Sequence, residues 1–390
     1  MNNVIRDEKL KAALNKQYLN QPADQVITKD QLANLQGTVT LDNKEIKDLT
    51  GMSYATQITA LYLNHNEIID ITPLKDMVNL RQISLMNNQI KDLRPMSSLV
   101  DLQSLNLSKN QIQSVWSLTK LKNLKTLFLD YNPLQSYDEL RFMKQLTLLS
   151  MRGVGISNLA VLLPLVNLEV LYLDDNKIQS LEPLSQLYLL YQLNINGNQV
   201  HNLKPIGALK YLQMLFANQN QIENLEPLKK LKQLQFLDLN HNHIEDLTPL
   251  ASVESLEALS IMNNRVKDLT PITKLPHLLA LLAQGNQITS LKGIHALPII
   301  SLENQSVEWE SIWVNKSEYA IELKGRLIDT NGEVPLITAI SPKTVTYDVL
   351  KSRLIVNQLE PLITVFFHNQ NEEIPFSGEL RLSFKEIGRA

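Results

Sequence analysis

The chain of 390 residues contains no cysteine. This absence excludes disulfide bonds, thiolate catalysis and cysteine-ligated zinc sites, although it does not identify the cellular compartment. Glycine is scarce, at 12 residues, and no low-complexity tract occurs, which argues against long disordered segments. The net charge is only −3, so we expect no broad basic surface for nucleic acid or anionic lipid.

Long apolar runs are also missing. No segment reaches the roughly 18 apolar residues of a candidate membrane span, so we expect no membrane insertion. The N-terminal segment MNNVIRDEKLKAAL lacks the apolar stretch of a signal peptide, because charged residues occupy positions 6–9. We therefore expect either a cytoplasmic protein or the mature part of an exported one.

A repeat of 22 residues dominates the chain. Moving from Asn66 in steps of 22 residues in both directions, the marked position is Asn in ten of twelve cases, without insertion or deletion. Such self-similarity at a fixed period indicates a repeat architecture. The ten residues are Asn66, Asn88, Asn110, Asn132, Asn176, Asn198, Asn220, Asn242, Asn264 and Asn286.

The residue pattern within each repeat predicts its local structure. Around each Asn the chain follows L-x-L-x-x-N-x-I, as in residues 105–112 and 237–244. The L-x-L alternation predicts a short strand with buried Leu side chains, and stacked strands predict a parallel sheet. A buried Asn can bond backbone groups that the tight corner leaves open, so we expect a continuous Asn ladder. A frequent Pro seven residues after the Asn predicts loops or 3₁₀ turns on the opposite side.

Two positions deviate from the ladder. Lys44 lies in the first repeat, where a capping repeat is expected to be atypical. Val154 lies in the middle of the array, between Gly153 and Gly155. We interpret Val154 as a tolerated apolar replacement in a flexible turn. The alternative is a break in the ladder that shapes a pocket.

The two ends differ from the repeats. In residues 1–36, RDEKLKAALNKQYL shows helical spacing, and ITKDQLANL predicts a second short helix with Thr28 as its N-cap, which together suggest a helical cap. Residues 37–300 hold about twelve repeats. In residues 301–390 the pattern alternates with period two, for example at 345–349 and 363–367, with turns at 329–332 and 369–373. This predicts a small Ig-like β-sandwich.

The combination resembles the internalins, leucine-rich-repeat surface proteins of Listeria, and their relatives in other Gram-positive bacteria. The resemblance covers essentially the whole chain and rests on repeats such as LYLNHNEIIDITPL and LDLNHNHIEDLTPL, on ITKDQLANL, and on the tail from ISLENQSVEW to GELRLSF. It implies an α/β leucine-rich-repeat solenoid, whose parallel sheet lines a horseshoe, between a helical cap and an all-β Ig-like sandwich. It also implies export and binding of host proteins through the concave face. The chain contains no LPxTG-type sorting motif and no GW module.

The strand pattern predicts which side chains face the concave surface. They lie at positions −1, +1, +3 and +4 relative to the first Leu of L-x-L. Eleven steps between strands give a face on the order of 50 Å by 13 Å, or roughly 700 Å², close to the ~800 Å² that each partner contributes to a standard interface. The predicted partner-binding residues are Tyr62, Phe128, Asp130, Tyr131, Arg152, Tyr172, Asp174, Phe216, Phe236 and Asp238.

Aromatic residues and Arg dominate interaction hot spots, so this set favours a protein partner. Its acidic members suggest basic groups on that partner. The alternative is that single exposed aromatic residues are ordinary surface scatter.

No nucleotide-binding, serine-hydrolase or zinc-protease motif occurs, so we expect no catalysis and no cofactor. His241 and His243 flank a ladder Asn, and we interpret them as surface polar residues rather than metal ligands. The leading hypothesis is a secreted or cell-surface virulence protein, monomeric, that binds a host or cell-surface protein. The first alternative is a cytosolic scaffold or regulatory subunit, as in phosphatase-regulatory proteins with 22-residue repeats. The second is an enzyme module in residues 301–390, a region without a nucleophile–base pair.

Overall fold

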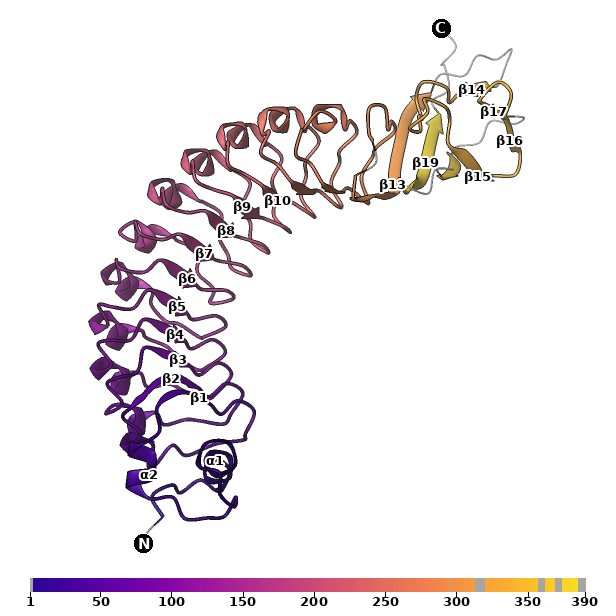
Figure 1. The fold of residues 1–390 in the computed structure, drawn as a ribbon. Coiled ribbons are helices and arrows are strands. Elements are labelled where there is room, and N and C mark those ends of the chain that lie inside the picture. Colours follow the sequence, from indigo (N-terminus) through magenta and orange to yellow (C-terminus); the bar gives the residue numbers. More distant parts are fainter. Residues whose placement is uncertain (1–2, 296, 313–319, 357–361, 369–373, 385–390) are drawn as a thin grey trace. The chain divides into compact units, whose positions relative to one another are not determined.

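The fold is described from a computed structural model, which covers residues 3–295, 297–312, 320–356, 362–368 and 374–384. The chain divides into two compact units, Met1–Asn198 and Gln199–Ala390. In each unit the short repeat strands follow one side of the stacked repeats, and 3₁₀ helices follow the other (Figure 1). Each unit is considered by itself.

The first unit begins with the predicted helices. Helix α1 (Glu8–Leu14) continues into a π-helical turn (Asn15–Leu19), and α2 (Lys29–Ala33) follows after a loop. Thr28 is the N-cap of α2, as predicted. Its hydroxyl accepts from the Gln31 N–H, and the Gln31 side chain accepts from the Thr28 N–H. This reciprocal capping box satisfies two backbone donors at the start of the helix.

Asp7 joins the helical segment to the first repeat. Its Oδ1 accepts from the N–H groups of Lys9 and Leu10 at the start of α1, at 2.9 and 3.0 Å. Its Oδ2 accepts from the N–H groups of Lys47 and Asp48, at 2.7 and 3.1 Å. Burial opposes the charge, but these four backbone donors outweigh it and hold the pKa of Asp7 below its ordinary value.

Short parallel strands order the repeats of the first unit. From β2 to β8 the paired residues of successive strands lie 22 positions apart in the sequence. The strands are β1 (Gly37–Thr40), β2 (Ile58–Tyr62), β3 (Gln82–Ser84), β4 (Ser104–Asn106), β5 (Thr126–Phe128), β6 (Leu148–Ser150), β7 (Val170–Tyr172) and β8 (Gln192–Asn194). The 3₁₀ helices are Met52–Tyr54, Thr72–Leu74, Arg94–Ser98, Trp116–Lys120, Asp138–Phe142, Ala160–Leu162 and Glu182–Gln186.

The repeat Asn residues are buried and form the predicted ladder. Asn110 is typical: its Nδ2 donates to the carbonyl of Leu85 in the preceding repeat, at 2.9 Å, and to that of Leu107 in its own repeat, at 3.0 Å. Its Oδ1 accepts from the Ile90 N–H at 3.0 Å. Each amide therefore supplies hydrogen bonds that the backbone cannot make at the corner.

The backbone around Val154 adapts to the missing amide. The Leu134 N–H occupies the position from which the N–H of other repeats donates to a ladder Asn. Here it donates to the Asn132 carbonyl at 2.9 Å instead. On the other side, Asn176 Oδ1 accepts from both Gly155 and Ile156, at 2.9 and 3.2 Å. These donors keep partners, which supports the interpretation of Val154 as a tolerated replacement.

The turn at Val154 is also linked to a depression, which the alternative interpretation requires. The Tyr137 hydroxyl donates to the Val154 carbonyl at 2.8 Å. Tyr137 and Leu163 belong to the lining of an open depression of about 620 Å³ on the side of the 3₁₀ helices. Tyr137 therefore connects the turn to the depression, but residues 153–155 are not among the residues that line it.

In the second unit the repeat strands are β9 (Met214–Phe216), β10 (Phe236–Asp238), β11 (Ala258–Ser260) and β12 (Ala280–Leu282), all parallel. The 3₁₀ helices are Lys204–Ala208, Glu226–Lys230, Thr248–Ser252 and Thr270–Ile272. Strand β13 (Ile299–Ile312) continues this sheet and then pairs with the C-terminal strand. The domain boundary predicted at 300/301 therefore falls within β13.

Gln305 on β13 adds a rung that the sequence did not predict. Its Nε2 donates to the carbonyls of Ala283 and Leu302, at 3.0 and 2.8 Å, and its Oε1 accepts from the Ile288 N–H at 3.0 Å. These contacts reproduce those of a ladder Asn. Gln305 lies 19 residues after Asn286, so a search in steps of 22 passes over it.

The C-terminal strands form two groups. In the first, β13 pairs with β19 (Phe376–Phe384) in parallel, and β19, β18 (Leu362–His368) and β15 (Leu336–Ser341) pair antiparallel. The second contains β14 (Ala320–Glu322), β17 (Arg353–Val356) and β16 (Val345–Asp348). The predicted strands at 345–349 and 363–367 correspond to β16 and β18. The predicted turn at 369–373 lies outside the described residues, and the Ig-like classification stays a prediction.

Candidate protein-interaction surface

In each unit the outward side chains of the repeat strands form a surface, and we call the two surfaces together the strand face. It comprises positions −1, +1, +3 and +4 relative to the first residue of the L-x-L motif in each repeat, such as Leu127, Leu149 and Leu171. Parallel pairing in register places equivalent positions in rows. One row contains Thr126, Leu148 and Val170, and the next contains Phe128, Ser150 and Tyr172.

Most of the predicted partner-binding residues in the first unit are accessible. Tyr131 is exposed, and the partly exposed residues are Tyr62, Phe128, Arg152 and Tyr172. The two acidic residues differ, because Asp130 and Asp174 are only 8% and 7% exposed. All of these residues except Tyr62 come from three successive repeats, whereas Tyr62 lies apart on β2.

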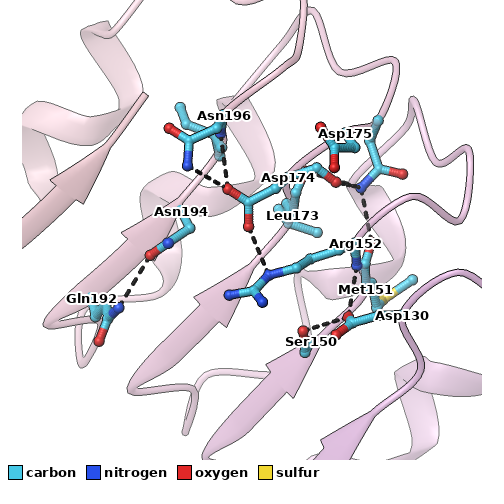
Figure 2. A network of polar contacts seen from close by, with 12 residues as sticks. Asp130, Ser150, Met151, Arg152, Leu173, Asp174, Asp175, Gln192, Asn194 and Asn196 are labelled. Carbon is cyan, nitrogen blue, oxygen red and sulfur yellow. Dashed lines mark hydrogen bonds and ion pairs between the residues drawn. The ribbon is translucent and has the colours of Figure 1, made fainter. Parts of the chain in front are cut away.

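The two buried carboxylates bind groups of the chain itself (Figure 2). Asp130 Oδ1 accepts from the Ser150 hydroxyl and from the Arg152 N–H. Asp174 Oδ2 accepts from Arg152 Nε at 2.9 Å, and its Oδ1 accepts from Asn196 Nδ2 at 2.6 Å. Asp130 and Asp174 therefore position their neighbours, and they do not offer free charge to a partner.

Side chains at position +3 form a second ladder, which the sequence interpretation missed. An Asp or Asn oxygen accepts from the N–H at the same position of the next repeat, as for Asp42 to Asn64 at 2.6 Å and Asn218 to Asn240 at 2.7 Å. The signal was present, because Asp or Asn occupies seven of the twelve +3 positions. These are Asp42, Asn64, Asp130, Asp174, Asn196, Asn218 and Asn240.

Arg152 is held in one orientation on the strand face. Its guanidinium carbon lies 4.4 Å from the centre of the Tyr172 ring, and its Nε bonds the buried Asp174. Stacking on an aromatic face and an ion pair to a fixed carboxylate both restrict the side chain. Arg152 and Tyr172 therefore form one preorganised group.

Tyr131 bridges two repeats at the edge of this group. Its hydroxyl donates to Asp175 Oδ2 at 2.8 Å, and Lys109 Nζ lies 5.8 Å from its ring centre. The hydrogen bond to Asp175 is the main cause that raises the pKa of Tyr131, with burial and the Asp175 charge adding to it.

The bridge also explains a glycine next to Val154. A Cβ added at Gly153 would come within 2.4 Å of the Tyr131 ring, and Gly153 has a φ of +58°. The ring therefore lies across Gly153, where no other residue leaves room for it.

In the second unit the predicted residues gather on β9 and β10. Phe216 and Phe236 are partly exposed, and Asp238 pairs with Phe216 in the sheet register. The Asp238 carboxylate accepts from Nδ2 of Asn218 at 2.8 Å and from Nδ2 of Asn240 at 2.6 Å. Among the described residues, no ion pair involves Asp238.

Three accessible apolar residues were absent from the predicted set. Leu148 on β6 is partly exposed beside Val170. Leu279 and Ile299 are 53% and 58% exposed at the strands β12 and β13. The prediction considered only aromatic and charged residues, so Leu148 was passed over. Leu279 precedes the defined strand positions, and Ile299 follows the end of the 22-residue register.

Within the described ranges, no group of three or more potential metal-ligating side chains occurs, and His241 Nε2 lies 3.3 Å from Asn263 Nδ2. No helix in that part of the chain is long and apolar enough to cross a membrane.

Comparisons with known proteins agree with the repeat geometry. The family model for leucine-rich repeats in two copies matches residues 56–99, 166–209 and 212–252. An internalin of Listeria monocytogenes, InlF, is 25% identical and aligns over 74% of this chain and 84% of its own, with a TM-score of 0.69. A search of curated protein sequences finds no match.

Two further solved structures share the fold alone. The functional domain of InlJ from Listeria monocytogenes aligns over 97% of both chains, with 18% identity and a TM-score of 0.65. It includes a cysteine ladder, whereas this chain has no cysteine. The ectodomain of a plant membrane receptor kinase from Arabidopsis thaliana, in complex with CASPARIAN STRIP INTEGRITY FACTOR 2, aligns over 73% of this chain and 40% of its own, with 20% identity and a TM-score of 0.57.

Proposed function

We propose that this internalin-like leucine-rich-repeat protein is a non-catalytic module that binds a protein partner through its strand face. The observation that carries the proposal is the preorganised group formed by Tyr172 on β7 and by residues that follow β5, β6 and β7. There Arg152 is stacked on Tyr172 and paired with Asp174, while Tyr131 is bonded to Asp175. Side chains already held in one conformation lose little entropy when a partner binds.

The composition of the strand face supports a protein ligand. Tyr, Phe and Arg are the residue types most enriched in protein interfaces and their hot spots, and they occur here at Phe128, Arg152, Tyr172, Phe216 and Phe236. The strands that carry Phe128, Tyr172 and Phe236 each pair with a parallel strand on both sides, which fixes their position in the sheet. Rigid elements with accessible aromatic residues are well suited to macromolecular recognition.

The finer proposal is that the protein is exported and engages a host or cell-surface protein. It is supported by the likeness to the Listeria internalin InlF, and by the internalin resemblance of the repeats and both ends. A plant receptor ectodomain of the same fold is in complex with another protein factor, which supports a binding role for such repeats.

Capture from a surface-protein extract of cultured mammalian cells tests the proposal. The strand-face variant combines Tyr172→Ala, Phe216→Ala and Phe236→Ala. The control variant removes three exposed aromatic residues outside the strand face, by Trp116→Ala, Phe142→Ala and Tyr188→Ala; these side chains are 60%, 50% and 51% exposed. We expect a protein captured by the unmodified chain and the control variant but not by the strand-face variant. Equal capture by all three, or capture lost only in the control variant, contradicts the proposal.

A further inference from the structure

We infer that the strand face of the second unit contains a subsite for a cationic side chain, with Asp238 as the anion and Phe216 and Phe236 as its aromatic walls. The inference rests on the proposed function and names the chemistry of one partner group, a Lys or Arg side chain. It concerns only residues of β9 and β10 and of the turns that follow them.

The Asp238 carboxylate is fixed in place without being neutralised. It is partly exposed, and its two oxygens accept from the side-chain amides of Asn218 and Asn240, at 2.8 and 2.6 Å. Both amides are themselves anchored: Asn218 Oδ1 accepts from the Asn240 N–H, and Asn240 Oδ1 accepts from the Met262 N–H. Neutral donors orient the carboxylate but leave its full charge, and an ionised carboxylate has about four acceptor sites.

Apart from His241, the surrounding strand face of the second unit offers no basic side chain of its own. Positions −1, +1, +3 and +4 of β9 to β12 contain no Lys and no Arg. They are Met214, Phe216, Asn218, Gln219, Phe236, Asp238, Asn240, His241, Ala258, Ser260, Met262, Asn263, Ala280, Leu282, Gln284 and Gly285. Glu257, just before β11, adds a second acidic residue. A Lys or Arg side chain that pairs with Asp238 would therefore come from a partner.

Two strand-face carboxylates of the first unit show the contrasting arrangement. There the strand-face carboxylate Asp174 is paired with Arg152, and Asp130 is only 8% exposed. In that unit the chain neutralises or covers these acids itself. Asp238 is accessible and bound only by neutral amides, so its charge is available to a ligand.

Two aromatic rings complete the subsite. Phe216 pairs with Asp238 on the neighbouring strand, about 4.8 Å away along the hydrogen-bonding direction. Phe236 lies two residues before Asp238 on the same strand and therefore on the same face, roughly 7 Å away. An ionised carboxylate beside aromatic faces favours a cation over a neutral group, because charge and ring quadrupole act in the same direction.

A library of random peptides displayed on phage, selected on the immobilised full chain, provides the probe. We expect the selected peptides to share a Lys or Arg residue. Replacing that residue by citrulline or acetyl-lysine should weaken binding to the unmodified chain by at least about tenfold. The same replacement should weaken binding to the Asp238→Asn variant by less than about twofold, because the two changes remove the same interaction.

Matched variants separate this subsite from general electrostatic attraction. Glu257→Gln removes one charge from the same region and should leave the tenfold effect in place. Phe236→Leu keeps apolar area but removes a ring, and should weaken peptide binding about three- to tenfold without unfolding the chain. Because it leaves the amide contacts of Asp238 intact, this variant remains informative if Asp238→Asn fails to fold.

The possible failures can be told apart. Peptides that bind the strand face but share no basic residue overturn the subsite and leave the proposed function standing. The subsite is also overturned, and the proposed function left standing, if the neutral replacement in the peptide weakens binding equally to the unmodified chain and to Asp238→Asn. If no peptide binding is lost in the strand-face variant, the proposed function and the subsite fail together.

Discussion

Replacing Asn110 with Ala removes four hydrogen bonds at a buried corner. Its Nδ2 donates to the carbonyls of Leu85, Leu107 and Ser108, at 2.9, 3.0 and 3.3 Å, and its Oδ1 accepts from the Ile90 N–H at 3.0 Å. The cost depends on which of these backbone groups keep another partner after the substitution.

The carbonyls keep partners because neighbouring rungs overlap. Asn88 Nδ2 still donates to Leu85 at 3.0 Å, and Asn132 Nδ2 still donates to Leu107 at 2.9 Å. The Asn87 N–H still donates to Ser108 at 2.9 Å.

The Ile90 N–H, by contrast, loses the acceptor that Asn110 provides. A buried donor without a partner costs about 1–3 kcal/mol, and each second bond lost at a carbonyl costs about 0.5 kcal/mol. We therefore expect Asn110→Ala to lower the free energy of unfolding by about 2.5–4.5 kcal/mol.

Urea unfolding followed by far-UV circular dichroism measures this change, provided the slope with urea is the same in both proteins. Gln111→Ala is the matched control, because this neighbouring side chain is exposed, and it should change stability by no more than about 0.5 kcal/mol. A loss of less than about 1 kcal/mol in Asn110→Ala would refute the role assigned to the ladder.

Three further predictions follow from single contacts. Asp7→Ala should destabilise the chain by about 1–2 kcal/mol at neutral pH. Because the pKa of Asp7 is lowered on folding, this stabilisation is present above the unfolded pKa of about 3.9 and is lost as the pH falls through the folded value. The difference between the two proteins in urea unfolding should therefore shrink on acidification; a constant difference contradicts the linkage. Asp175→Asn should lower the pKa of Tyr131, measured by ultraviolet titration against Tyr131→Phe, and no change in the titration excludes the bridge. Gly153→Ala should cost about 1–3 kcal/mol in thermal unfolding, because of its positive φ and the Tyr131 ring; an unchanged melting temperature contradicts this packing.

The sequence predicted the strands, the ladder and the N-cap at Thr28 because these depend on local pattern. A period of 22 residues with Leu and Asn at fixed places specifies which side chains turn inward, and Thr28 with Gln31 forms a capping box within four residues. In each case the residues that carry the signal are close in sequence or equivalent by repeat.

The strand face was only partly predictable, because the exposure of a side chain there depends on which side chain of the next repeat contacts it. Asp130 and Asp174 occupy the same pattern positions as exposed residues, yet both are buried. Their carboxylates accept hydrogen bonds from Ser150, Arg152 and Asn196 of the following repeats. The periodicity shows that position +3 lies on this face. It does not show which side chain of the next repeat reaches back to it.

The roles of Gly153 and Gln305 were harder to predict from the sequence. Gly153 looked like a source of flexibility beside Val154, but its role becomes clear only when the Tyr131 ring is placed across it. Gln305 escaped because the last spacing is 19 residues and the side chain is longer by one methylene. A search of the sequence for Asn or Gln after L-x-x, without a fixed spacing from the previous repeat, would have found it.

Calorimetric titration of the captured partner tests the central claim, that the strand face binds a protein, most directly. The partner would be titrated into the unmodified chain, the strand-face variant and the control variant, after circular dichroism has shown that all three are folded. We expect the strand-face variant to bind at least about 100-fold more weakly, and the control variant to bind within about twofold of the unmodified chain. Unchanged affinity in the folded strand-face variant would contradict the account.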